Sequence, residues 1–328
     1  MTAAYDVAAI GNAIVDVLAR ADDAFLDAEG LDKGSMRLID EARAHELYGR
    51  MAAGVEASGG SAANTIAGVA SFGGRSLFVG KVARDALGEV FTHDIRAVGA
   101  RFDTPSLNSG PATGRCLINV TPDGERTMCT FLGAAVRLTP HDVDPEAVAA
   151  ARILYLEGYL FDPEDARAAF GKAAAAARAA DRTIALSLSD SFVVERHRQG
   201  LLSFIDAEVD VLFANEAEVG ALFECDFESG LAALDGRVKL AAVTRGAKGS
   251  VILAAGARTE VAAEPVDHVV DTTGAGDQYA AGFLVGLAGG RPPAECGRLG
   301  SMAAAEVIGH FGPRPQIRLA ELTSAGGA

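Results

Sequence analysis

The feature that most constrains the fold is the alternation of apolar, β-rich runs with helical stretches along most of the chain. The runs typical of strands cover residues 6–17, 75–82, 151–160, 182–189, 210–216 and 240–246. Between them lie helical patterns such as "PEDARAAFGKAAAAARAADR", which begins with proline and acidic residues as helix starts often do. Strands that alternate with helices favour a mainly parallel sheet with helices on both faces, so we predict an α/β chain.

Two segments, residues 13–40 and 112–132, break this alternation. The second alternates polar and apolar residues about a "TPDG" turn, which is typical of a β-hairpin. Both segments have the half-polar pattern of a sheet with one wet face. We predict that together they form a small β lid over a large domain built from residues 1–12, 41–111 and 133–328. The alternative is two unrelated surface excursions.

Charge and composition exclude several classes of protein. Lys and Arg total 29 against 44 Asp and Glu, a net charge of −15 at pH 7, so a nucleic-acid polymer is not an expected partner. The start, "MTAAYDVAAIG", lacks the basic segment of a signal peptide, and no uncharged apolar run approaches the ~20 residues of a membrane helix. The four cysteines form no C-x-x-C pair. We expect a cytoplasmic protein with free thiols, although Cys116 and Cys129 fall near-opposite each other on the predicted hairpin and a disulfide between them is conceivable.

The glycine pattern after the first strand argues against two common nucleotide sites. "AIGNAIVD" contains only Gly11 where a dinucleotide fingerprint requires three glycines, and no G-x-x-x-x-G-K-[ST] phosphate loop occurs in the chain. A bound nucleotide would therefore need another device to hold its phosphates.

The segment "TTGAGD", which leads into an apolar helical pattern, can be that device. Small residues let the backbone amides of Gly274, Ala275 and Gly276 point outward at a helix start, where the helix dipole also favours an anion. We predict an anion hole there, with Asp277 at its edge. The alternative is that Asp277 only caps the helix, which leaves the two glycines and Asp271 unexplained.

A second glycine cluster, "EASGGSAANTIAGVASFGG", also enters a helix. Gly59 and Gly60 permit close approach of a ligand to the backbone, and Asn64 can both donate and accept hydrogen bonds, as a sugar hydroxyl requires. Taken alone, this stretch is explained better by a glycine turn before a polar first helical turn than by a binding site.

Together the two glycine segments resemble the two signatures of the ribokinase-like (PfkB) carbohydrate and nucleoside kinases. Between them, "NEAE" (215–218) is similar to the N-x-x-E motif of this family, and "TRGAKG" (244–249) is similar to its nucleotide loop. The order and spacing of the four motifs agree over residues 6–315. The resemblance implies a ribokinase-like three-layer α/β/α domain with a small β-sheet lid, and an ATP-dependent, Mg²⁺-requiring phosphotransferase with an alcohol acceptor.

The resemblance also implies roles for the matching residues. Asp277 would be the catalytic base, and the amides just before it would hold the transferred phosphoryl group. Asn215 and Glu218 would order Mg²⁺ and its waters, and Thr244 and Gly246 would line the nucleotide loop.

In many relatives, the acid that opens the anion loop binds a monovalent cation such as K⁺. Here that acid is Asp271, which would act together with the backbone carbonyl of Thr273. A second cation-binding loop would lie within residues 303–314, where no firm motif is present.

On the acceptor side, Asp16 and Asn64 resemble the sugar-clamping residues of the family, with Gly59 and Gly60 in close contact. A carboxylate accepts two hydroxyl donors, so Asp16 fits a vicinal diol such as that of ribose. Its alternative role is a solvated charge on an edge strand.

Four features bear on the identity of the acceptor. Asn12 and Asp16 are spaced as in adenosine kinases, and Tyr159 and Phe161 are candidates to flank a base. Glu157 instead occupies the position of a sugar-contacting glutamate in ribokinases. Met36 would turn from the lid onto the substrate or pack in the lid core.

The leading hypothesis is a kinase of purine salvage that phosphorylates the 5′-hydroxyl of a nucleoside, with adenosine as first choice. The alternative within the family is a sugar kinase acting on ribose, fructose or a related sugar. Two other classes are a catalytically silent nucleoside-binding protein and a nicotinamide-dependent dehydrogenase suggested only by the parallel sheet. Expected partners are small molecules alone, with the chain a monomer or a homodimer whose lids pair strand edges.

Overall fold

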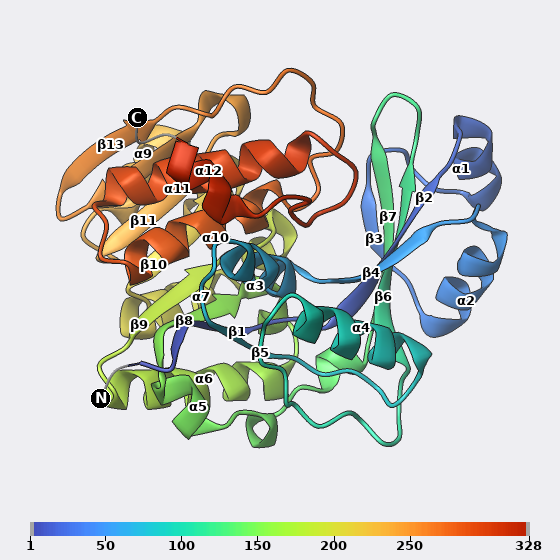
Figure 1. Cartoon of the computed structure of the whole chain (residues 1–328), viewed down its shortest axis with the longest axis horizontal. Helices are drawn as coiled ribbons and strands as arrows, with labels where there is room; N and C mark the ends of the chain where they lie inside the picture. Colours follow the sequence, from blue (N-terminus) through green and yellow to red (C-terminus); the bar gives the residue numbers. More distant parts are fainter. Residues whose placement is uncertain (1–2, 326–328) are drawn as a thin grey trace.

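The computed structural model describes residues 3–325, which form two β-sheets lying next to each other (Figure 1). From edge to edge, the larger sheet contains β13 (Ala257–Val261), β12 (Ser250–Ala254), β11 (Leu240–Thr244), β10 (Val211–Asn215), β9 (Thr183–Ser187), β8 (Ala151–Glu157), β1 (Tyr5–Ile10) and β5 (Ser76–Val79). All neighbours from β11 to β5 pair in parallel, whereas β12 and β13 are antiparallel. The predicted mainly parallel sheet is therefore confirmed.

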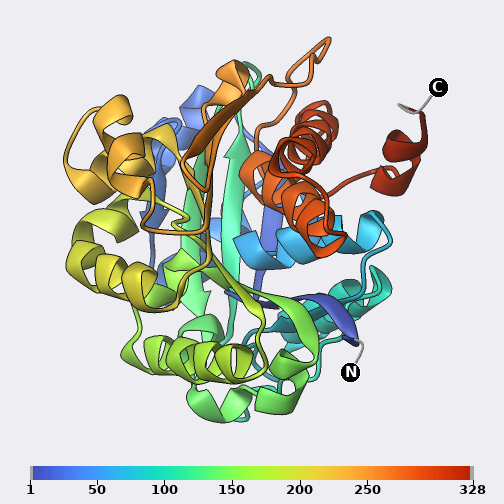
Figure 2. The same cartoon turned by 90° about the vertical axis from the view of Figure 1, so that its left-hand side faces the viewer.

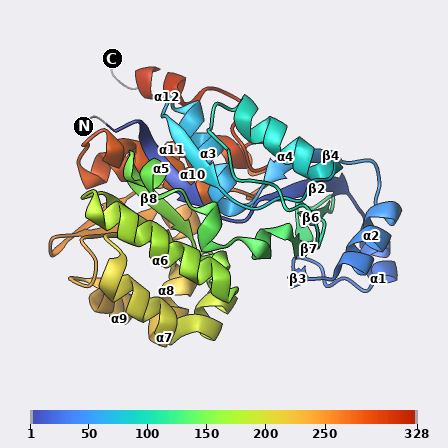
Figure 3. The same cartoon turned by 90° about the horizontal axis from the view of Figure 1, so that it is seen from below.

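Helices cover both faces of this sheet (Figures 2 and 3). One face carries α5 (Pro145–Ala149), α6 (Glu164–Ala179), α7 (Ser191–Glu208), α8 (Glu216–Phe223) and α9 (Phe227–Leu234), and the other carries α3 (Ser61–Ser71), α4 (Ala86–Ala97), α10 (Ala275–Ala288), α11 (Pro293–Ile308) and α12 (Leu319–Ala325). Along β1, Val7 and Ala9 pack into one hydrophobic core, and Ala8 and Ile10 pack into the other. Apolar side chains on both faces of the strand explain why its sequence is a continuous apolar run.

The smaller sheet contains five strands and has two helices of its own. Its order is β3 (Met36–Leu38), β7 (Arg126–Gly133), β6 (Thr113–Val120), β2 (Ile14–Arg20) and β4 (Val55–Gly59), with α1 (Asp23–Glu29) and α2 (Glu41–Arg50) packed on its outer face. Strand β4 pairs antiparallel with β2. Residues 41–111, which contain β4 and α2, were predicted to lie in the large domain, whereas β4 pairs within the smaller sheet. The exact division into two domains stays a prediction.

Strands β6 and β7 form the predicted antiparallel hairpin. Cys116 lies opposite Thr130 and Cys129 lies opposite Leu117, so the two thiols point to opposite faces of the sheet. All four cysteines are free, and the conceivable Cys116–Cys129 disulfide is absent.

The first apolar run divides into β1 and β2, which belong to different sheets. The break lies at residues 11–13. A side chain at Gly11 would come within 2.4 Å of Glu157 Oε2, so only glycine fits at this crossing. The crossing places Asn12 between the two sheets.

Four short 3₁₀ turns complete the described chain. They span Ala134–Arg137, Pro140–Asp142, Gly158–Phe161 and Gly246–Lys248. Within residues 3–325, no helix is both long enough and apolar enough to cross a membrane.

Candidate active site

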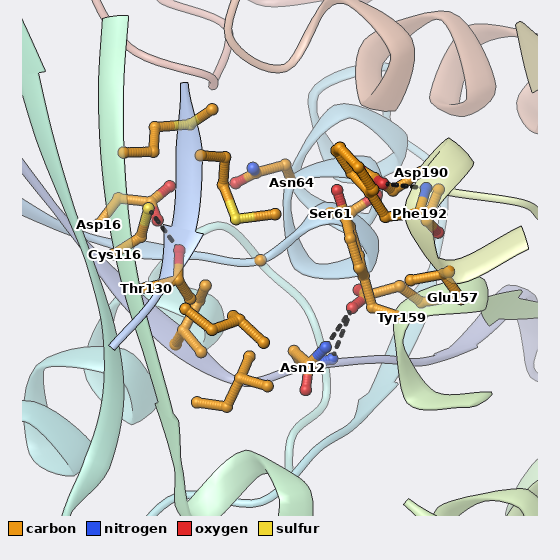
Figure 4. Close-up of a pocket in the computed structure, with 18 of the residues that line it drawn as sticks. Asn12, Asp16, Ser61, Asn64, Cys116, Thr130, Glu157, Tyr159, Asp190 and Phe192 are labelled. Carbon is orange, nitrogen blue, oxygen red and sulfur yellow. Dashed lines mark hydrogen bonds between the residues drawn. The ribbon is translucent and has the colours of Figure 1, made fainter. Parts of the chain in front are cut away.

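A cavity of about 410 Å³ lies between the strand ends of the larger sheet and the inner face of the smaller sheet (Figure 4). Its polar lining includes Asn12, Asp16, Ser61, Asn64, Glu157, Ser189, Asp190, Thr273 and Asp277. Its apolar lining includes Ile14, Met36, Leu38, Ile118, Met128, Leu132, Tyr159, Phe192 and Val193. One cavity thus brings together residues from the front, the middle and the back of the chain.

The start of α10 has the geometry of an anion-binding helix end. Its N-cap, Gly274, has φ 78° and ψ −1°, and a side chain there would come within 2.5 Å of the Pro313 carbonyl oxygen. A side chain at Gly276 would meet nothing within 4 Å, so space is open beside that residue. The Ala275 amide donates to the Thr272 carbonyl at 3.3 Å and is already engaged. Of the three predicted amides, that of Ala275 is therefore the least available to a phosphate.

Asp277 lies in the first turn of α10 and is not its cap, so the capping alternative is wrong. Its Oδ1 accepts a hydrogen bond from Ser61 Oγ at 2.6 Å, and its Oδ2 accepts one from Asn64 Nδ2 at 3.2 Å. Burial raises the pKa of Asp277 to about 6, and these two hydrogen bonds partly oppose the shift. The carboxylate therefore faces the cavity and joins α10 to α3.

Both polar atoms of the Asn64 side-chain amide form hydrogen bonds. In addition to the bond to Asp277, its Oδ1 accepts from Arg314 Nε at 3.3 Å. The sequence predicts that Asn64 offers its amide to a sugar, and no motif in it indicates Arg314. Burial lowers the pKa of Arg314 to about 10, while the charge of Asp16 raises it. Arg314 thus places a positive charge behind the acceptor side of the cavity.

Asp16 lies on β2 between β4 and β6 and is only 4% exposed. Within the described chain, its carboxylate has no hydrogen-bond or ion-pair partner. Burial raises its pKa to about 7, against an opposing effect of Arg314. A side chain at Gly59 would come within 2.2 Å of the Asp16 carboxyl group, and one at Gly60, where φ is 96°, would come within 2.1 Å of the Asn12 carbonyl oxygen. The two glycines are therefore needed to fit Asp16 and Asn12 against the backbone.

Glu157 is fully buried at the end of β8. Its Oε1 accepts from the Asn12 backbone amide at 3.1 Å and from Asn12 Nδ2 at 2.8 Å (Figure 4). Its Oε2 accepts from the Ala62 amide at 2.7 Å. Burial raises its pKa to about 7, and the three hydrogen bonds oppose that shift. Asn12 Oδ1 is buried and has no partner.

Both oxygens of the Asp271 carboxylate accept hydrogen bonds at the loop before α10. Its Oδ1 accepts from the backbone amide of Thr273 at 2.9 Å and from its hydroxyl at 2.6 Å, and its Oδ2 accepts from the Gly312 amide at 3.0 Å. Arg126 Nε lies 3.3 Å from Oδ1, and Arg126 Nη2 donates to Thr272 Oγ1 at 2.7 Å. Arg126, which the sequence analysis missed, comes from the lid hairpin and supplies positive charge next to Asp271. The positive charge of Arg126 thus competes with a monovalent cation for this carboxylate, and the cation site at Asp271 and Thr273 stays a prediction.

The predicted nucleotide residues also lie side by side. Asn215 and Thr244 are register partners on β10 and β11, and Gly246, with φ 57°, begins the turn after β11. Asn215 caps α8 by accepting from the Glu218 amide at 2.8 Å, and Glu218 accepts from the Asn215 backbone and side-chain nitrogens. Burial raises the pKa of Glu218 to about 7.

The aromatic residues of the cavity differ from those expected. Tyr159 lines the cavity, but Phe161 is buried against Phe170 and Phe204 because the 3₁₀ turn directs it the other way. Phe192, at the start of α7, is 63% exposed on the cavity wall. An aromatic residue two positions after the helix cap Asp190 was the available signal for it. Met36 does reach the cavity.

Comparisons with known proteins agree on a family. Residues 30–318 match the pfkB family of carbohydrate kinases. The crystal structure of adenosine kinase from Sinorhizobium meliloti is similar at 52% identity and a TM-score of 0.94, over 98% of this chain and 99% of that one. The structure of a probable sugar kinase protein from Rhizobium etli CFN 42 is similar at 46% identity and a TM-score of 0.95, over 99% of both chains.

Curated relatives include kinases for both kinds of acceptor. Fructokinase of Klebsiella pneumoniae is 30% identical over 243 residues, which are 71% of this chain and 78% of that protein. Adenosine kinase of Saccharomyces cerevisiae is 28% identical over 274 residues, which are 78% of this chain and 79% of that protein.

Proposed function

Because the chain belongs to the pfkB family of carbohydrate kinases, we propose that it transfers the γ-phosphoryl group of MgATP to the 5′-hydroxyl of a nucleoside, with adenosine as the first candidate. Kinases of this family phosphorylate hydroxyl groups of sugars or nucleosides with ATP as co-substrate, so the protein is a phosphotransferase with an alcohol acceptor. The observation that carries the nucleoside proposal is the cavity itself. It combines carboxylate and amide acceptors with a largely apolar wall drawn from the smaller sheet, the Gly158–Phe161 turn and α7.

On the acceptor side, the Asp16 carboxylate lines the cavity and lacks a hydrogen-bond partner among the described residues. A buried acceptor without a partner favours a ligand that donates hydrogen bonds, and a vicinal diol brings two O–H donors. Apolar side chains such as Leu38 and Phe192 suit the flat faces of a base better than the hydroxyl-covered faces of a free sugar. These two properties together support a nucleoside.

Asp277 is the residue best placed to act as general base. With a pKa of about 6 it is ionised at neutral pH, and it can take the proton of a hydroxyl held ~2.6–3.2 Å away. Ser61 and Asn64 hold the carboxylate at the cavity. As the phosphoryl group moves, the amides at the start of α10 would stabilise its charge.

The residues present fit a magnesium ion that is held mainly by phosphate oxygens and water. Within residues 3–325, no group of three or more His, Cys, Asp or Glu side chains is spaced to hold a metal. Glu218 keeps acceptor capacity beyond its bonds to Asn215 and could bind waters of the ion. When bound, Mg²⁺ would shield the charge of the transferred group.

A panel assay of ADP release tests the proposal. Purified protein is given MgATP with adenosine, other nucleosides, ribose and fructose in turn. We expect nucleosides to have the highest kcat/KM, with adenosine first. Turnover of free sugars alone would contradict the proposal. Tight nucleoside binding in calorimetry, with no ADP formed at saturating MgATP, would instead indicate a silent binding protein.

A sugar kinase is the second candidate, and specific observations favour it. Glu157, the counterpart of a sugar-contacting glutamate in ribokinases, lines the cavity, and fructokinases are among the relatives. The same panel decides between the two acceptors.

The proposal also covers the oligomeric state of the enzyme and its localisation. The edge strand β4 exposes Val55, which is 61% exposed, so we retain a lid-paired homodimer beside the monomer as a testable state. Analytical ultracentrifugation separates the two.

The free cysteines support the expectation of a cytoplasmic enzyme, and a role in purine salvage follows if adenosine is the acceptor.

A further inference from the structure

We propose that Arg314 is a positioning residue for catalysis, whose guanidinium holds the side-chain amide of Asn64 in the orientation that donates a hydrogen bond to Asp277. The inference rests on the proposed function, in which Asp277 is the base of a phosphoryl transfer. It concerns contacts within the protein and requires no particular acceptor in the cavity.

The backbone that carries Arg314 is fixed against both helices of the site. Arg314 lies between Pro313 and Pro315, and a proline fixes its own φ and restricts the residue before it, so few backbone conformations are open to Arg314. The Pro313 carbonyl accepts from Gln278 Nε2 at 3.0 Å. Gln278 is fully buried near the start of α10, and its Nε2 also donates to the backbone carbonyl of Asn64, on α3, at 3.0 Å. The guanidinium therefore extends from a segment that is already bonded to α10 and lies next to α3.

The two partners of the Asn64 side chain leave it one orientation. A guanidinium can only donate, so Arg314 Nε must face the amide oxygen, which it does at 3.3 Å from Oδ1. An ionised carboxylate can only accept, so Asp277 must face the amide nitrogen, and its Oδ2 lies 3.2 Å from Nδ2. Asn64 is 3% exposed, so water has little access to replace either partner. The amide thus links the position of Arg314 to that of the base.

The charges around this chain of contacts show what it does for the base. Burial lowers the pKa of Arg314 to about 10, and the carboxylates of Asp16 and Asp94 raise it, so Arg314 stays charged at neutral pH. The hydrogen bond from Asn64 lowers the pKa of Asp277. Without that bond Asp277 would keep its proton to higher pH, and a protonated carboxyl group cannot take the proton of the acceptor hydroxyl.

The first experiment is a double-mutant cycle on the whole protein with the best acceptor from the panel. It compares kcat of the wild type, Arg314→Met, Asn64→Ala and R314M/N64A. Methionine keeps an apolar stem and removes both the donor and the charge. We expect R314M to lower kcat about tenfold in the wild-type background and less than about twofold in the N64A background, because it acts through Asn64.

Arg318→Met is the matched control. Arg318 lies on the same segment and is exposed, so R318M removes the same charge without touching the site. Its kcat should stay within about twofold of the wild-type value.

The pH profile of kcat is a readout that a merely structural role would not move in this way. In R314M the acidic limb should shift to higher pH, because Asp277 loses the support of Asn64. In N64A the limb already lies at higher pH, and adding R314M should move it no further. Four other titratable groups sense the charge of Asp277, namely Asp16, Tyr155, Glu157 and Tyr159.

The double variant also separates Asp277 from Asp16. The charge of Arg314 lowers the pKa of Asp16, so R314M raises that pKa as well. A limb shift that comes from Asp16 does not depend on Asn64 and would persist when R314M is added to N64A.

Several results would overturn the proposal. These are an unchanged kcat in R314M, equal falls in kcat in the two backgrounds, a limb shift by R314M that persists in N64A, or an N64A limb at the wild-type pH. A fall in R318M as large as that in R314M would assign the effect to the net charge of the segment. Thermal melting shows whether each variant folds.

Nuclear magnetic resonance keeps the proposal testable if R314M does not fold. With selective isotope labelling of arginine in the wild type and N64A, the Nε–H signal of Arg314 should move and exchange faster with water once its acceptor is removed. If no arginine signal responds to N64A, the contact is absent and the proposal fails. If instead Asp277→Asn keeps full activity, the proposed base fails, while the cycle and the spectra still report whether Arg314 acts through Asn64.

Discussion

At the scale of single residues, the buried carboxylates of the cavity differ in their partners rather than in their burial. Burial is the first cause of the raised pKa of Asp16, Glu157 and Asp277 alike. Asp277 and Glu157 are held by hydrogen bonds from the protein, whereas Asp16 is left for a ligand. Asp277 is therefore poised as a base, Glu157 holds Asn12 and Ala62 in place, and the Asp16 carboxylate is left to bind a ligand.

Replacing Asp277 by Asn tests the base. The variant keeps the shape of the side chain but cannot take a proton, so kcat should fall by about 10²–10⁴-fold. The dissociation constant for MgATP, measured by calorimetry, should change little. A comparable loss of MgATP binding would show that Asp277 serves the structure of the nucleotide site instead.

The pH dependence of the reaction tests the ionisation state of the same group. Since a base works only when deprotonated and the pKa of Asp277 is raised to about 6, kcat/KM should fall as the pH drops through about 6–7, a range that includes the Asp16 pKa of about 7. The Ser61 hydroxyl lowers the pKa of Asp277, so Ser61→Ala should move this acidic limb to higher pH. If kcat/KM of S61A falls at the same pH as that of the wild type, the acidic limb does not report the ionisation of Asp277.

Asp16 should reduce the stability of the unliganded protein at neutral pH. Its folded pKa of about 7 lies above the ordinary value of 3.8, so its stabilising, protonated form is fully present below pH 4 and is lost as the pH rises through 7. Asp16→Asn removes this penalty and should stabilise the protein by about 2–4 kcal/mol above pH 7 while it weakens acceptor binding.

Denaturant unfolding of the wild type and D16N from pH 4 to 8 measures this difference. The gain should be near zero at pH 4, grow between pH 4 and 7 and then level off. A gain that is the same at every pH would assign the effect to packing rather than to charge.

At the scale of elements, the sequence correctly predicts the helices and strands that have a pattern within one continuous stretch of chain. The hairpin of β6 and β7 was predicted because its alternation and its turn lie within one continuous stretch. The start of α10 was predicted because consecutive small residues precede an apolar helix. Strand β4 was missed because only its pairing with β2, far away in sequence, makes it a strand.

The same distinction explains which site residues were found. Asp277 and Asn64 belong to continuous glycine-rich segments, which can be found in the sequence and become specific as an ordered pair. Arg126 and Arg314 are ordinary surface-type residues in their own segments, and they acquire a role only where folding brings them to Asp271 and Asn64. No spacing in the sequence carries such contacts.

The contact between the lid hairpin and the loop before α10 bears on the monovalent cation. Arg126 already neutralises Asp271, and every oxygen of that carboxylate has a partner. We therefore expect kcat to change by less than about twofold when K⁺ is replaced by choline at constant ionic strength. Arg126→Ala should then make the rate depend on K⁺. A strict K⁺ requirement in the wild type would restore the cation site predicted at Asp271 and Thr273.

At the scale of the whole molecule, the active site belongs to neither sheet alone. Asp16 and Met36 come from the smaller sheet, and Glu157 and Asp277 come from the larger sheet and its helices. An acceptor that contacts both parts must hold them together. Binding should therefore bury cavity side chains that are exposed in the free protein, of which Phe192 and Leu38 are the largest, at 63% and 54% exposure.

The absence of tryptophan from the sequence makes this closure directly measurable. In Phe192→Trp, the only tryptophan lies on the cavity wall, and its emission should shift to shorter wavelength when the acceptor binds and the lid covers it. Tyr48→Trp provides a matched control, because Tyr48 is 42% exposed on the lid but does not line this cavity. Its emission should stay constant. An unchanged spectrum of F192W at saturating acceptor, with activity intact, would mean that the acceptor binds away from α7 and that the lid does not close over this wall.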